Sequence, residues 1–526
     1  MPKRLIIIAL AACIVTTAKS TTRIIDVPDA STWSNTAIST INNGDTVLFN
    51  APVLVCRNWG YGGFYGLQMS VRRVYSPTNQ ALPKSQEYYQ QIALNNSALF
   101  TLVGAGYHRN GERLNNLKAV KSGNLELTFI SGNWEGNNTR NAIRHTLPDV
   151  DMQANHDLLV CAANLEYYLV ENLGTGYGPD NQTEHNRQRT KVIAALAEIA
   201  ADLYGLVEIE QGQAALEEIA TYLSQETGFS YTWIDDHGSA NGSYTKSGYV
   251  YRMDKLAPIG ALRNNNTVVQ NRKKIQAFRV IDSGETFVYS INHFKAKSGT
   301  GYGLDADQGD GQGIFNNSRK REAENILTNM PTYCAIDKDF LMMGDLNAYA
   351  KEDPIQTLVN GGLTDLHRYF HADSSYSYQY GAEAGYLDHA LCNSTMLAQV
   401  TGLGVWHVNS DESDEYTYDK SSDITPFRYS DHDPVLVGLH LDSTLSITPT
   451  IDNTQIELVG GDLCITNAYG NDKSFYELYT ISGTKVIGYT PITQDNMPIN
   501  HQLAAGVYIL KIYYAETTKV FRIFIH

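Results

Sequence analysis

The pattern of apolar and polar positions changes twice along the chain and divides it into three regions. Between residues 155 and 441, apolar runs of strand length such as Leu158–Ala163 and Phe340–Met343 alternate with segments whose apolar residues have helical spacing. One such segment carries Val192, Leu196, Ile199 and Leu203. Many strands and rather few helices predict an α/β domain in which a two-sheet core is flanked by helices.

The regions on either side have short alternating runs punctuated by glycines. Between residues 22 and 150, runs such as Thr46–Phe49 and Leu125–Ile130 predict a small all-β module, for which the sequence supports only a spacer or substrate-docking role. A polar linker at 442–452 follows the middle region. Residues 453–526 then return to short β runs, so we expect a second small β domain with a sandwich fold.

The first residues have the pattern of a leader. Lys3 and Arg4 precede the apolar stretch Leu5–Val15, which predicts a signal peptide over residues 1–20. Cys13 follows Leu-Ala-Ala, so lipoprotein processing with acylation of this cysteine is the open alternative. Later segments fall short of the roughly 20 apolar residues that a spanning helix needs, and we expect an exported protein without a membrane span.

The chain is acidic, and loss of the leader makes it more so. Its formal net charge of −16 becomes −19 when the three cations Lys3, Arg4 and Lys19 are removed. This balance disfavours long-range attraction of a polyanion, so any nucleic-acid binding must depend on local basic groups. The candidates, each of which also suits an ordinary solvated surface run, are Arg187/Arg189/Lys191, Arg272/Lys273/Lys274, Lys295/Lys297 and Arg319/Lys320/Arg321.

The cysteines point to no metal site or disulfide framework. Those that remain after the leader lack a C-x-x-C spacing. They are Cys56, Cys161, Cys334, Cys392 and Cys464. Cys161 and Cys392 lie in apolar, strand-like runs, where we expect a buried thiol.

Polar side chains that could bind metal or move protons recur where the strands of the middle region end. They are Asn164, Glu208, His293, Asp345, Asn347, Asp388, Asp431 and His432. Each alone is weak evidence, because a single Asn or Asp at a strand end is more often a turn former. Together they supply hard oxygen ligands, two histidines and acids to orient them, which suits magnesium- or calcium-assisted phosphodiester hydrolysis. Glu210 follows Glu208 by two residues, so strand geometry alone cannot choose between these carboxylates.

The order of these residues resembles the endonuclease/exonuclease/phosphatase superfamily, the DNase I-like hydrolases. The shared motifs are Asn164, Gly205-Leu-Val-Glu208, Asn292-His293, Gly344-Asp-Leu-Asn347, Leu387-Asp388 and Ser430-Asp-His432. The segments Arg187-Gln-Arg189 and Asn292-His-Phe-Lys-Ala-Lys297 are most similar in sequence to those of secreted bacterial nucleases. The resemblance implies a four-layer fold with two sheets between helices.

The resemblance also implies a metal and a general base. Asn164 and Glu208 would hold the cation, with Asp431 close enough to contribute. The cation would be Mg²⁺, with Ca²⁺ or Mn²⁺ as alternatives. His432 would activate the attacking water, and Asp388 would fix its tautomer and stabilise the imidazolium that forms.

The remaining positions would handle the phosphate. By resemblance, Asp345 and Asn347 would position the water and the phosphate, and His293 would bind the phosphate or assist the leaving oxygen. Arg252 and Lys295 are candidate phosphate contacts, with a structural role as the equal alternative for each.

The carboxyl-terminal runs resemble the sorting domain of the type IX secretion system. They are Tyr476–Gly483, Leu503–Leu510 and Lys519–Phe524. The resemblance implies recognition by that secretion machinery and export through the periplasm of a Gram-negative bacterium, either into the medium or to the cell surface. An ordinary adhesive β module is the open alternative.

The sequence therefore predicts a secreted, monomeric, metal-dependent nuclease that acts on DNA, and on RNA as a further option. A phosphatase or a phospholipid phosphodiesterase on the same scaffold is the main alternative, because a fold does not determine its substrate. A cell-surface binding protein with a vestigial site is an alternative of another class. It is disfavoured because every expected catalytic position is occupied.

Overall fold

A computed structural model of the chain describes residues 20–61, 64–135, 146–236, 245–265, 268 and 271–441, with short segments between 455 and 525. The predicted signal peptide up to residue 19, including Cys13, and the linker at 442–452 lie outside the described residues. The chain divides into two compact units. The larger is made of residues up to Arg279 and Thr286–His440, and the smaller contains Leu441–His526.

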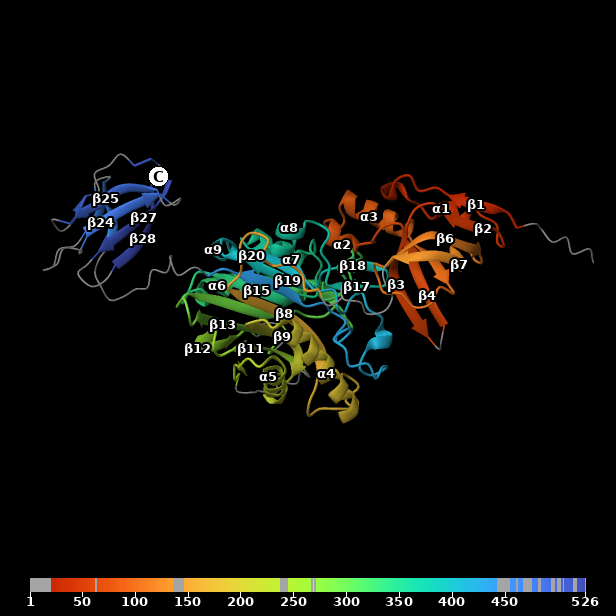
Figure 1. Ribbon diagram of the computed structural model, residues 1–526, viewed down its shortest axis with the longest axis horizontal. Helices are drawn as coiled ribbons and strands as arrows, with labels where there is room; N and C mark the ends of the chain where they lie inside the picture. The colour runs from red at the N-terminus through yellow and green to blue at the C-terminus, as the bar shows by residue number, and fades with distance from the viewer. Residues whose placement is uncertain are drawn as a thin grey trace, which may run out of the picture. The chain divides into compact units, whose positions relative to one another are not determined.

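The amino-terminal module of the larger unit is a seven-stranded sheet with the order β1-β2-β6-β3-β4-β5-β7 (Figure 1). The strands are β1 (Thr22–Ile25), β2 (Thr46–Phe49), β3 (Val53–Tyr61), β4 (Phe64–Ser70), β5 (Phe100–Val103), β6 (Arg113–Lys121) and β7 (Glu126–Glu135). The structure adds helices to a module that the sequence predicted as all-β: α1 (Thr36–Ser39), α2 (Pro77–Gln80) and α3 (Gln86–Asn96). Most residues of α3 are polar or aromatic, so its sequence carries no clear apolar stripe.

Two six-stranded sheets form the middle region. The first has the order β10 (Tyr231–Trp233), β11 (Thr245–Arg252), β9 (Leu203–Glu210), β8 (Leu158–Tyr168), β21 (Val435–Leu439) and β20 (Val400–Val405). The second has the order β12 (Leu256–Asn264), β13 (Lys273–Val280), β14 (Thr286–Asn292), β15 (Phe340–Asp345), β19 (Asp388–Cys392) and β16 (Thr364–Asp365). A short hairpin, β17 (Tyr378–Tyr380) and β18 (Glu383–Gly385), stands apart from both sheets.

Helices cover the outer faces of this sandwich (Figure 1). Apolar side chains of α4 (Gln182–Ile199) and α5 (Ala214–Thr227) pack on the first sheet, and those of α6 (Asn316–Tyr333) and α7 (Asp353–Asn360) pack on the second. The shorter helices are α8 (Leu366–His371) and α9 (Ser394–Leu397).

The inner faces of the two sheets pack against each other. The Tyr249 hydroxyl on β11 lies 2.7 Å from the carbonyl oxygen of Lys274 and accepts a bond from the Ile291 amide, both in the second sheet. A side chain at Gly205 on β9 would collide with Tyr289 of β14, so the glycine allows this close approach. The predicted fold class, a two-sheet α/β sandwich flanked by helices, is confirmed.

Strand direction brings several chain segments to one edge of the sandwich. β8 runs parallel to β9, and β14 runs parallel to β15, so the carboxyl ends of each pair lie together. β21 and β19 are antiparallel to β8 and β15, which places their amino ends at the same edge. At this edge Gly344, with φ of 124°, adopts a conformation that favours glycine, and a Cβ atom there would collide with the backbone of Asn292 on β14.

The smaller unit contains only β structure among its described residues. A three-stranded sheet is formed by β22 (Gln455–Val459), β23 (Asp462–Thr466) and β26 (Met497–Pro498). A four-stranded sheet is formed by β25 (Lys485–Pro491), β24 (Phe475–Thr480), β27 (Gly506–Tyr513) and β28 (Thr518–Ile525). Its buried core includes Leu478, Leu510 and Ile512. In the described parts of both units, none of the helices has the length and apolarity to cross a membrane.

Candidate active site

Residues far apart in the sequence meet at the edge where the parallel strands end. Asn164 lies in β8 and Glu208 in β9, while His293 directly follows β14 and Asp345 ends β15. The Nε2 atom of His293 lies 3.6 Å from Glu208 Oε1 and 3.6 Å from Asp345 Oδ2. Glu208, His293 and Asp345 are called the carboxylate cluster below.

Glu208 and Glu210, which the sequence could not separate, have different partners. The buried Glu210 carboxylate accepts hydrogen bonds from the backbone amides of residues 170–172 at 2.6, 2.8 and 2.7 Å. Glu208 instead faces His293 and keeps 16% of its side chain exposed. A positive φ of 58° at Glu208 interrupts the regular strand, so the simple two-residue alternation fails here. Glu208 is the candidate ligand, whereas Glu210 secures a turn.

Asp345 lies at the centre of an amide network. Its Oδ1 accepts a bond from the Asn347 backbone amide at 2.8 Å, and its Oδ2 accepts from the side-chain amides of Asn347 and Asn164 at 3.2 and 3.3 Å. Burial raises the pKa of Asp345 to about 7; His432 acts in the opposite direction, and Asp388 adds to the rise. Asn347 has a φ of 49°, which is a second strained residue at this edge.

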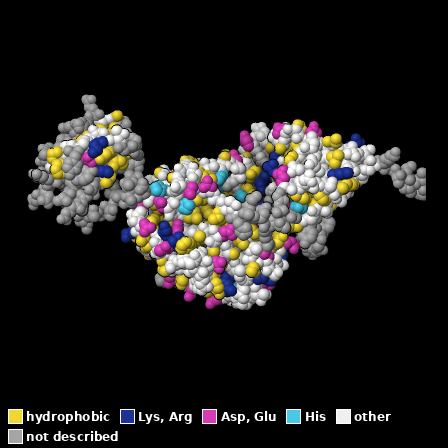
Figure 2. Space-filling view, viewed as in Figure 1, with side chains coloured by type: hydrophobic (Ala, Val, Ile, Leu, Met, Phe, Trp, Pro, Cys, Tyr) yellow, Lys and Arg dark blue, Asp and Glu magenta, His cyan; other side chains and the backbone are white. Residues whose placement is uncertain are grey.

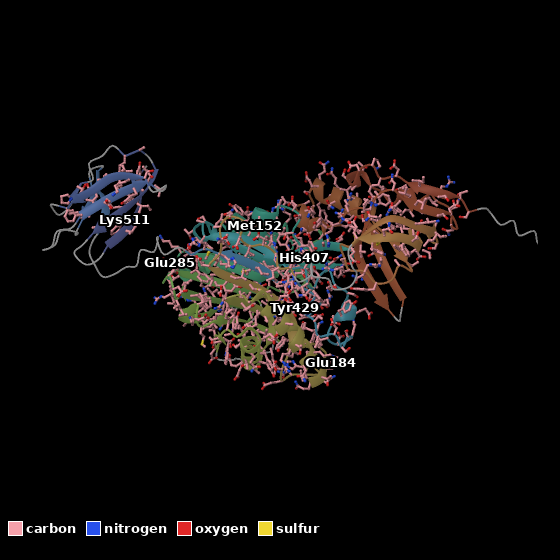
Figure 3. The ribbon with its side chains drawn as sticks, in the orientation of Figure 1. Met152, Glu184, Glu285, His407, Tyr429 and Lys511 are labelled. Carbon is pink, nitrogen blue, oxygen red and sulfur yellow. The ribbon has the colours of Figure 1, made fainter. Side chains whose placement is uncertain are left out.

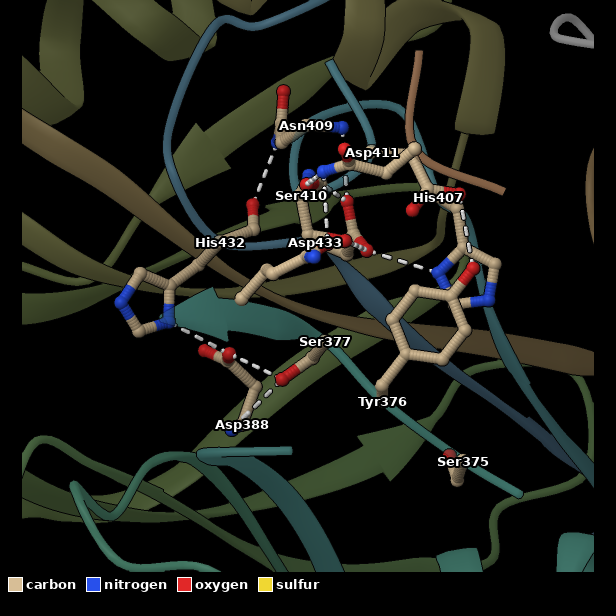
Figure 4. Close-up of polar contacts among 12 residues, drawn as sticks. Ser375, Tyr376, Ser377, Asp388, His407, Asn409, Ser410, Asp411, His432 and Asp433 are labelled. Atoms are coloured by element: carbon tan, nitrogen blue, oxygen red, sulfur yellow. Dashed lines mark hydrogen bonds and ion pairs between the residues drawn. The ribbon is translucent and has the colours of Figure 1, made fainter. Parts of the chain in front are cut away.

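His432 and Asp388 form a hydrogen-bonded pair beside the cluster (Figure 4). The Nδ1 atom of His432 lies 2.7 Å from Asp388 Oδ2, which also accepts a 2.7 Å bond from the Ser377 hydroxyl. Nε2 of His432 faces the cluster, 3.9 Å from Asp345 Oδ2 and 3.9 Å from Asp431 Oδ1. The loop that carries His432 follows the fully buried Tyr429, which is labelled in Figure 3, whereas Asp388 begins β19. Asp388 therefore binds Nδ1 of His432, while Nε2 is directed towards the carboxylate cluster, where a reactant would bind.

The two histidines have opposite pKa shifts. Burial lowers the pKa of His432, but the carboxylates of Asp388, Asp431 and Asp345 together raise it well above the ordinary value. For His293, burial and then the nearby Arg272 lower the pKa well below the ordinary value. His293 is therefore a neutral imidazole, and neither ring nitrogen has a hydrogen-bond partner among the described residues.

Arg272 is a site residue that the sequence marked only as part of a basic run. Its carbonyl oxygen accepts the backbone amide of His293 at 2.8 Å, and its guanidinium donates to Thr245 Oγ1 at 3.2 Å. The other two cations of that run are engaged elsewhere, Lys273 with Glu322 and Lys274 with Asp236. The antiparallel pairing of β13 with β14 could have identified Arg272 as a site residue. In that register Lys273 pairs with Asn292, so Arg272 lies opposite His293.

Arg252, for which the sequence left a phosphate contact and a structural role as equal alternatives, lies away from the carboxylate cluster. It ends β11, whose antiparallel pairing with β9 places it near Leu203 at the opposite edge of the sheet. There its guanidinium binds Asp202 at 3.1 Å and Asp254 at 2.6 Å. These ion pairs occupy Arg252, so it has a structural role. Lys295 stays near the site, with its ammonium 4.2 Å from the ring centroid of Phe315.

The site has the donors that a divalent cation needs. Ligand atoms of Glu208, His293 and Asp345 all lie within 4.8 Å of one another. Burial, and then repulsion by Asp431, raise the pKa of Glu208, so negative charges have been brought together at this edge. Carboxylate oxygens are the donors preferred by Mg²⁺ and Ca²⁺, and Glu208 and Asp345 supply them. The residues therefore fit a divalent cation.

Comparison with known families identifies the middle region. The model of the Endonuclease/Exonuclease/phosphatase family matches residues 172–432, which include every predicted site position except Asn164. This region is a domain of that family. The endonuclease/exonuclease/phosphatase domain is accordingly a hydrolase of phosphate esters or phosphodiesters. A search of curated proteins finds no match to the chain.

Solved structures with low identity are similar to about half of this chain. An endonuclease/exonuclease/phosphatase family protein from Bacteroides thetaiotaomicron is 18% identical, with 54% of this chain and 97% of that chain covered and a TM-score of 0.37. A mannosyl-6-phosphatase from the same species is 17% identical over 54% and 100% of the two chains, with a TM-score of 0.36. The human Nocturnin catalytic domain, with bound sulfate, is 12% identical over 56% and 96%, with a TM-score of 0.38.

Proposed function

We propose that the protein is an exported, divalent-metal-dependent nuclease that hydrolyses phosphodiester bonds of DNA. The observation that carries the proposal is the His432–Asp388 pair, whose Nε2 atom faces Asp345 of the carboxylate cluster at 3.9 Å. A general base held in one tautomer beside a cation site is the arrangement that metal-assisted attack of water requires.

His432 is the proposed general base. Because Nδ1 is held by Asp388, Nε2 is the atom that takes the proton from water, and Asp388 stabilises the imidazolium that results. A divalent cation held by Glu208, Asp345 and the amide oxygen of Asn164 would neutralise the two carboxylates and stabilise charge on the phosphate. The pKa of His432 would then fall towards its ordinary value, because Asp345 is one of the carboxylates that raise it. The ring can then exist in the neutral form that a base needs.

The phosphate would lie between the cluster and the basic residues behind it. His293 is neutral and donates from one ring nitrogen to a phosphate oxygen or to the leaving oxygen. Arg272 supplies a positive charge next to His293, and Lys295 is the second candidate cation. The Asn347 side chain is held by Asp345 and the Phe294 carbonyl, which keeps it in place to orient water or phosphate.

Local cations matter because the surface as a whole is acidic. The chain carries 56 Asp and Glu against 40 Lys and Arg. On the face shown in Figure 2, acidic side chains are spread over the larger unit among scattered basic ones. Binding of DNA would then be weak at long range and would depend only modestly on added salt, because few phosphate contacts are available near Arg272 and the salt dependence scales with their number.

The test is cleavage of supercoiled plasmid by the purified mature protein in Mg²⁺, Ca²⁺ or Mn²⁺ and in excess chelator. We expect metal-dependent nicking that is lost with chelator and in His432→Ala. Arg252→Met is the matched control, because it removes a cation of the same domain at the opposite edge. Intact plasmid under every metal would reject the nuclease proposal. Release of phosphate from phosphomonoesters, or of headgroups from phospholipids, would then support the alternative substrates.

We further propose that the protein is exported and that the smaller unit directs it to the type IX secretion machinery. The support is the leader pattern of residues 1–20 and the alternating runs that form β24, β27 and β28. Expression in a Gram-negative host with and without that machinery tests the proposal. Mature protein should reach the medium or cell surface only when the machinery is present, and export without it would reject the sorting role.

A further inference from the structure

The amino-terminal module is joined to the endonuclease/exonuclease/phosphatase domain by buried charges. Arg73 of the module donates to Asp411 Oδ1 at 3.2 Å, and Arg109 donates to Glu412 Oε1 at 3.0 Å. Asp411 and Glu412 have 6% and 0% of their side chains exposed. A buried ion pair fixes one geometry, because a displaced partner would leave an uncompensated charge in the interior. The loop that carries Asp411 is therefore held by the module.

The same loop holds the segment that leads to the catalytic pair. Asp411 Oδ2 accepts a 2.9 Å hydrogen bond from the Tyr376 hydroxyl, and the Arg73 guanidinium lies 4.2 Å from the centre of the Tyr376 ring. The other neighbour of Tyr376 is His407, whose ring stacks on it at 3.8 Å with an interplanar angle of 1°. Tyr376 is thus enclosed by residues of the module and of the loop (Figure 4).

Residues 376–379, called the connector below, contact the module at both ends and the catalytic pair in the middle. The Ser377 hydroxyl donates to Asp388 at 2.7 Å, and the Tyr378 ring lies 4.5 Å from the ring of His432. Gln379 returns to the module: its amide nitrogen donates to the carbonyl oxygen of Cys56, and its Oε1 accepts from Asn110 at 2.8 Å. The four consecutive residues therefore touch both regions.

The backbone next to His432 belongs to the same network. The Asp433 amide donates to the Ser377 carbonyl at 2.8 Å, and the Asp433 carboxylate accepts the amides of Asn409 and Ser410, each at 2.8 Å. The Asn409 side chain donates to the carbonyl oxygen of His432 at 2.6 Å. Both the imidazole and the main chain of the proposed base are anchored to the connector and to the loop that the module holds (Figure 4).

From this chain of contacts we propose that the amino-terminal module is a structural part of the catalytic centre: Arg73 holds Asp411 and Tyr376, so that Ser377 fixes Asp388 and thereby orients His432. Arg73, Asp411, Tyr376 and Ser377 are positioning residues, since none of them touches the reacting atoms. The inference rests on the proposed role of His432 as general base. It predicts that a change in the module lowers turnover without weakening substrate binding.

The experiment compares variants of the full-length mature protein. Arg73→Lys keeps the charge but changes the donor geometry, and Ser377→Ala removes the hydroxyl that binds Asp388. Asp411→Asn weakens the link from the loop side. Arg72→Ala is the matched control, because the adjacent Arg72 donates to the carbonyl oxygens of Ala30 and Ser31 within the module itself. The substrate is bis(p-nitrophenyl) phosphate, which is too small to need a docking surface on the module.

Two readouts separate this inference from the proposed function. The first is kcat and KM in saturating metal, where Arg73→Lys and Ser377→Ala should lower kcat by about tenfold with KM little changed. The second is amide hydrogen exchange, which needs no activity: peptides covering 374–380 and 430–434 should exchange faster in Arg73→Lys than in Arg72→Ala. Backbone protection there depends on bonds such as that from the Asp433 amide to Ser377.

Each outcome decides the inference. A lower kcat together with faster exchange in Arg73→Lys and Ser377→Ala, with Arg72→Ala like the wild type, supports it. Unchanged exchange in those peptides, unchanged kcat, or a change confined to KM would overturn it. If the wild type cleaves no phosphodiester, the proposed function fails, whereas faster exchange would still establish the structural link between Arg73 and His432. If Arg73→Lys does not fold, Ser377→Ala and Asp411→Asn provide the same two measurements.

Discussion

The carboxylate cluster has a different environment from two carboxylates of the same domain that lie outside it, Glu210 and Asp236. Within the cluster, Glu208 and Asp345 both lie 3.6 Å from the Nε2 atom of His293, whose ring nitrogens make no hydrogen bond to the described residues. Burial raises the pKa of both carboxylates. Two residues beyond Glu208, the Glu210 carboxylate is saturated by backbone amides. Asp236 lies between the ammonium groups of Lys246 and Lys274.

The hydrogen-bond partners distinguish the two groups. Glu210 and Asp236 are bound by donors and stabilise the fold, whereas Glu208 and Asp345 remain available for a ligand. A carboxylate surrounded by donors contributes to stability, whereas one that faces other carboxylates lowers it until a cation arrives. The single strand β9 therefore carries one carboxylate that stabilises the fold, Glu210, and one that is left for a ligand, Glu208.

The largest expected effect is on activity, in Glu208→Gln. Loss of one anionic ligand should lower kcat/KM by about a thousandfold, or roughly 4 kcal/mol of transition-state stabilisation. Thermal stability without metal should stay the same or rise, because a buried like charge has been removed. Plasmid cleavage and calorimetry measure the two quantities, and full activity of the variant would reject Glu208 as a ligand.

Glu210→Gln should show the reverse behaviour. One of the oxygens that accept the amides of residues 170–172 becomes an NH₂ group, so roughly 2 kcal/mol of stability should be lost. The folded variant should keep metal-dependent cleavage, since Glu210 does not face His293. Melting temperature and activity per folded molecule are the measurements. Loss of cleavage at full stability would mean that the two glutamates have been assigned the wrong way round.

The variant Asp236→Asn tests, through the pH dependence of stability, whether this carboxylate outside the cluster stabilises the fold. Burial acts to raise the pKa of Asp236, but Lys246 and Lys274 outweigh it and lower the pKa from 3.8 to about 2. A lowered folded-state pKa gives stability that is present above pH 4 and is lost as the pH falls towards 2, here roughly 2 kcal/mol. The variant should therefore be less stable than the wild type at pH 6, and denaturation curves should show the gap closing between pH 4 and 2. A gap that is constant across this range would contradict the ion-pair explanation.

Arg252→Met should have the smallest effect on catalysis, because its partners Asp202 and Asp254 lie at the opposite edge from the cluster. We expect kcat/KM to change by less than about twofold. Arg272→Met, which removes the cation beside His293, is the informative partner in the same assay. Equal loss of activity in the two variants would show that the assignment of the phosphate-binding side is wrong.

Strands with long apolar runs were predicted well from sequence. Leu158–Ala163 lies within β8, and Phe340–Met343 lies within β15. The strand β13 was not predicted, because Lys273, Lys274 and Gln276 are buried in it and hide the apolar pattern. Their burial is possible only because partners such as Glu322 come from distant segments, which no local pattern contains.

The site was predictable to the extent that motifs fix the position of a residue on a strand. Asn164, His293 and Asp345 follow from apolar strands whose ends meet at one edge. The sequence could not show which of Glu208 and Glu210 is the candidate metal ligand, because the answer depends on the left-handed backbone conformation of Glu208. Ser377 was missed because it lies in a polar loop, and only the tertiary fold brings its hydroxyl to Asp388.

Gly344 has a further consequence for the motif Gly344-Asp-Leu-Asn347. Its Cα lies so close to the Asn292 backbone that no side chain could fit between β14 and β15. Asn292 immediately precedes His293, and Gly344 immediately precedes Asp345. Gly344 therefore sets the spacing between β14 and β15 at the active site. In this way it limits the distance between His293 and Asp345.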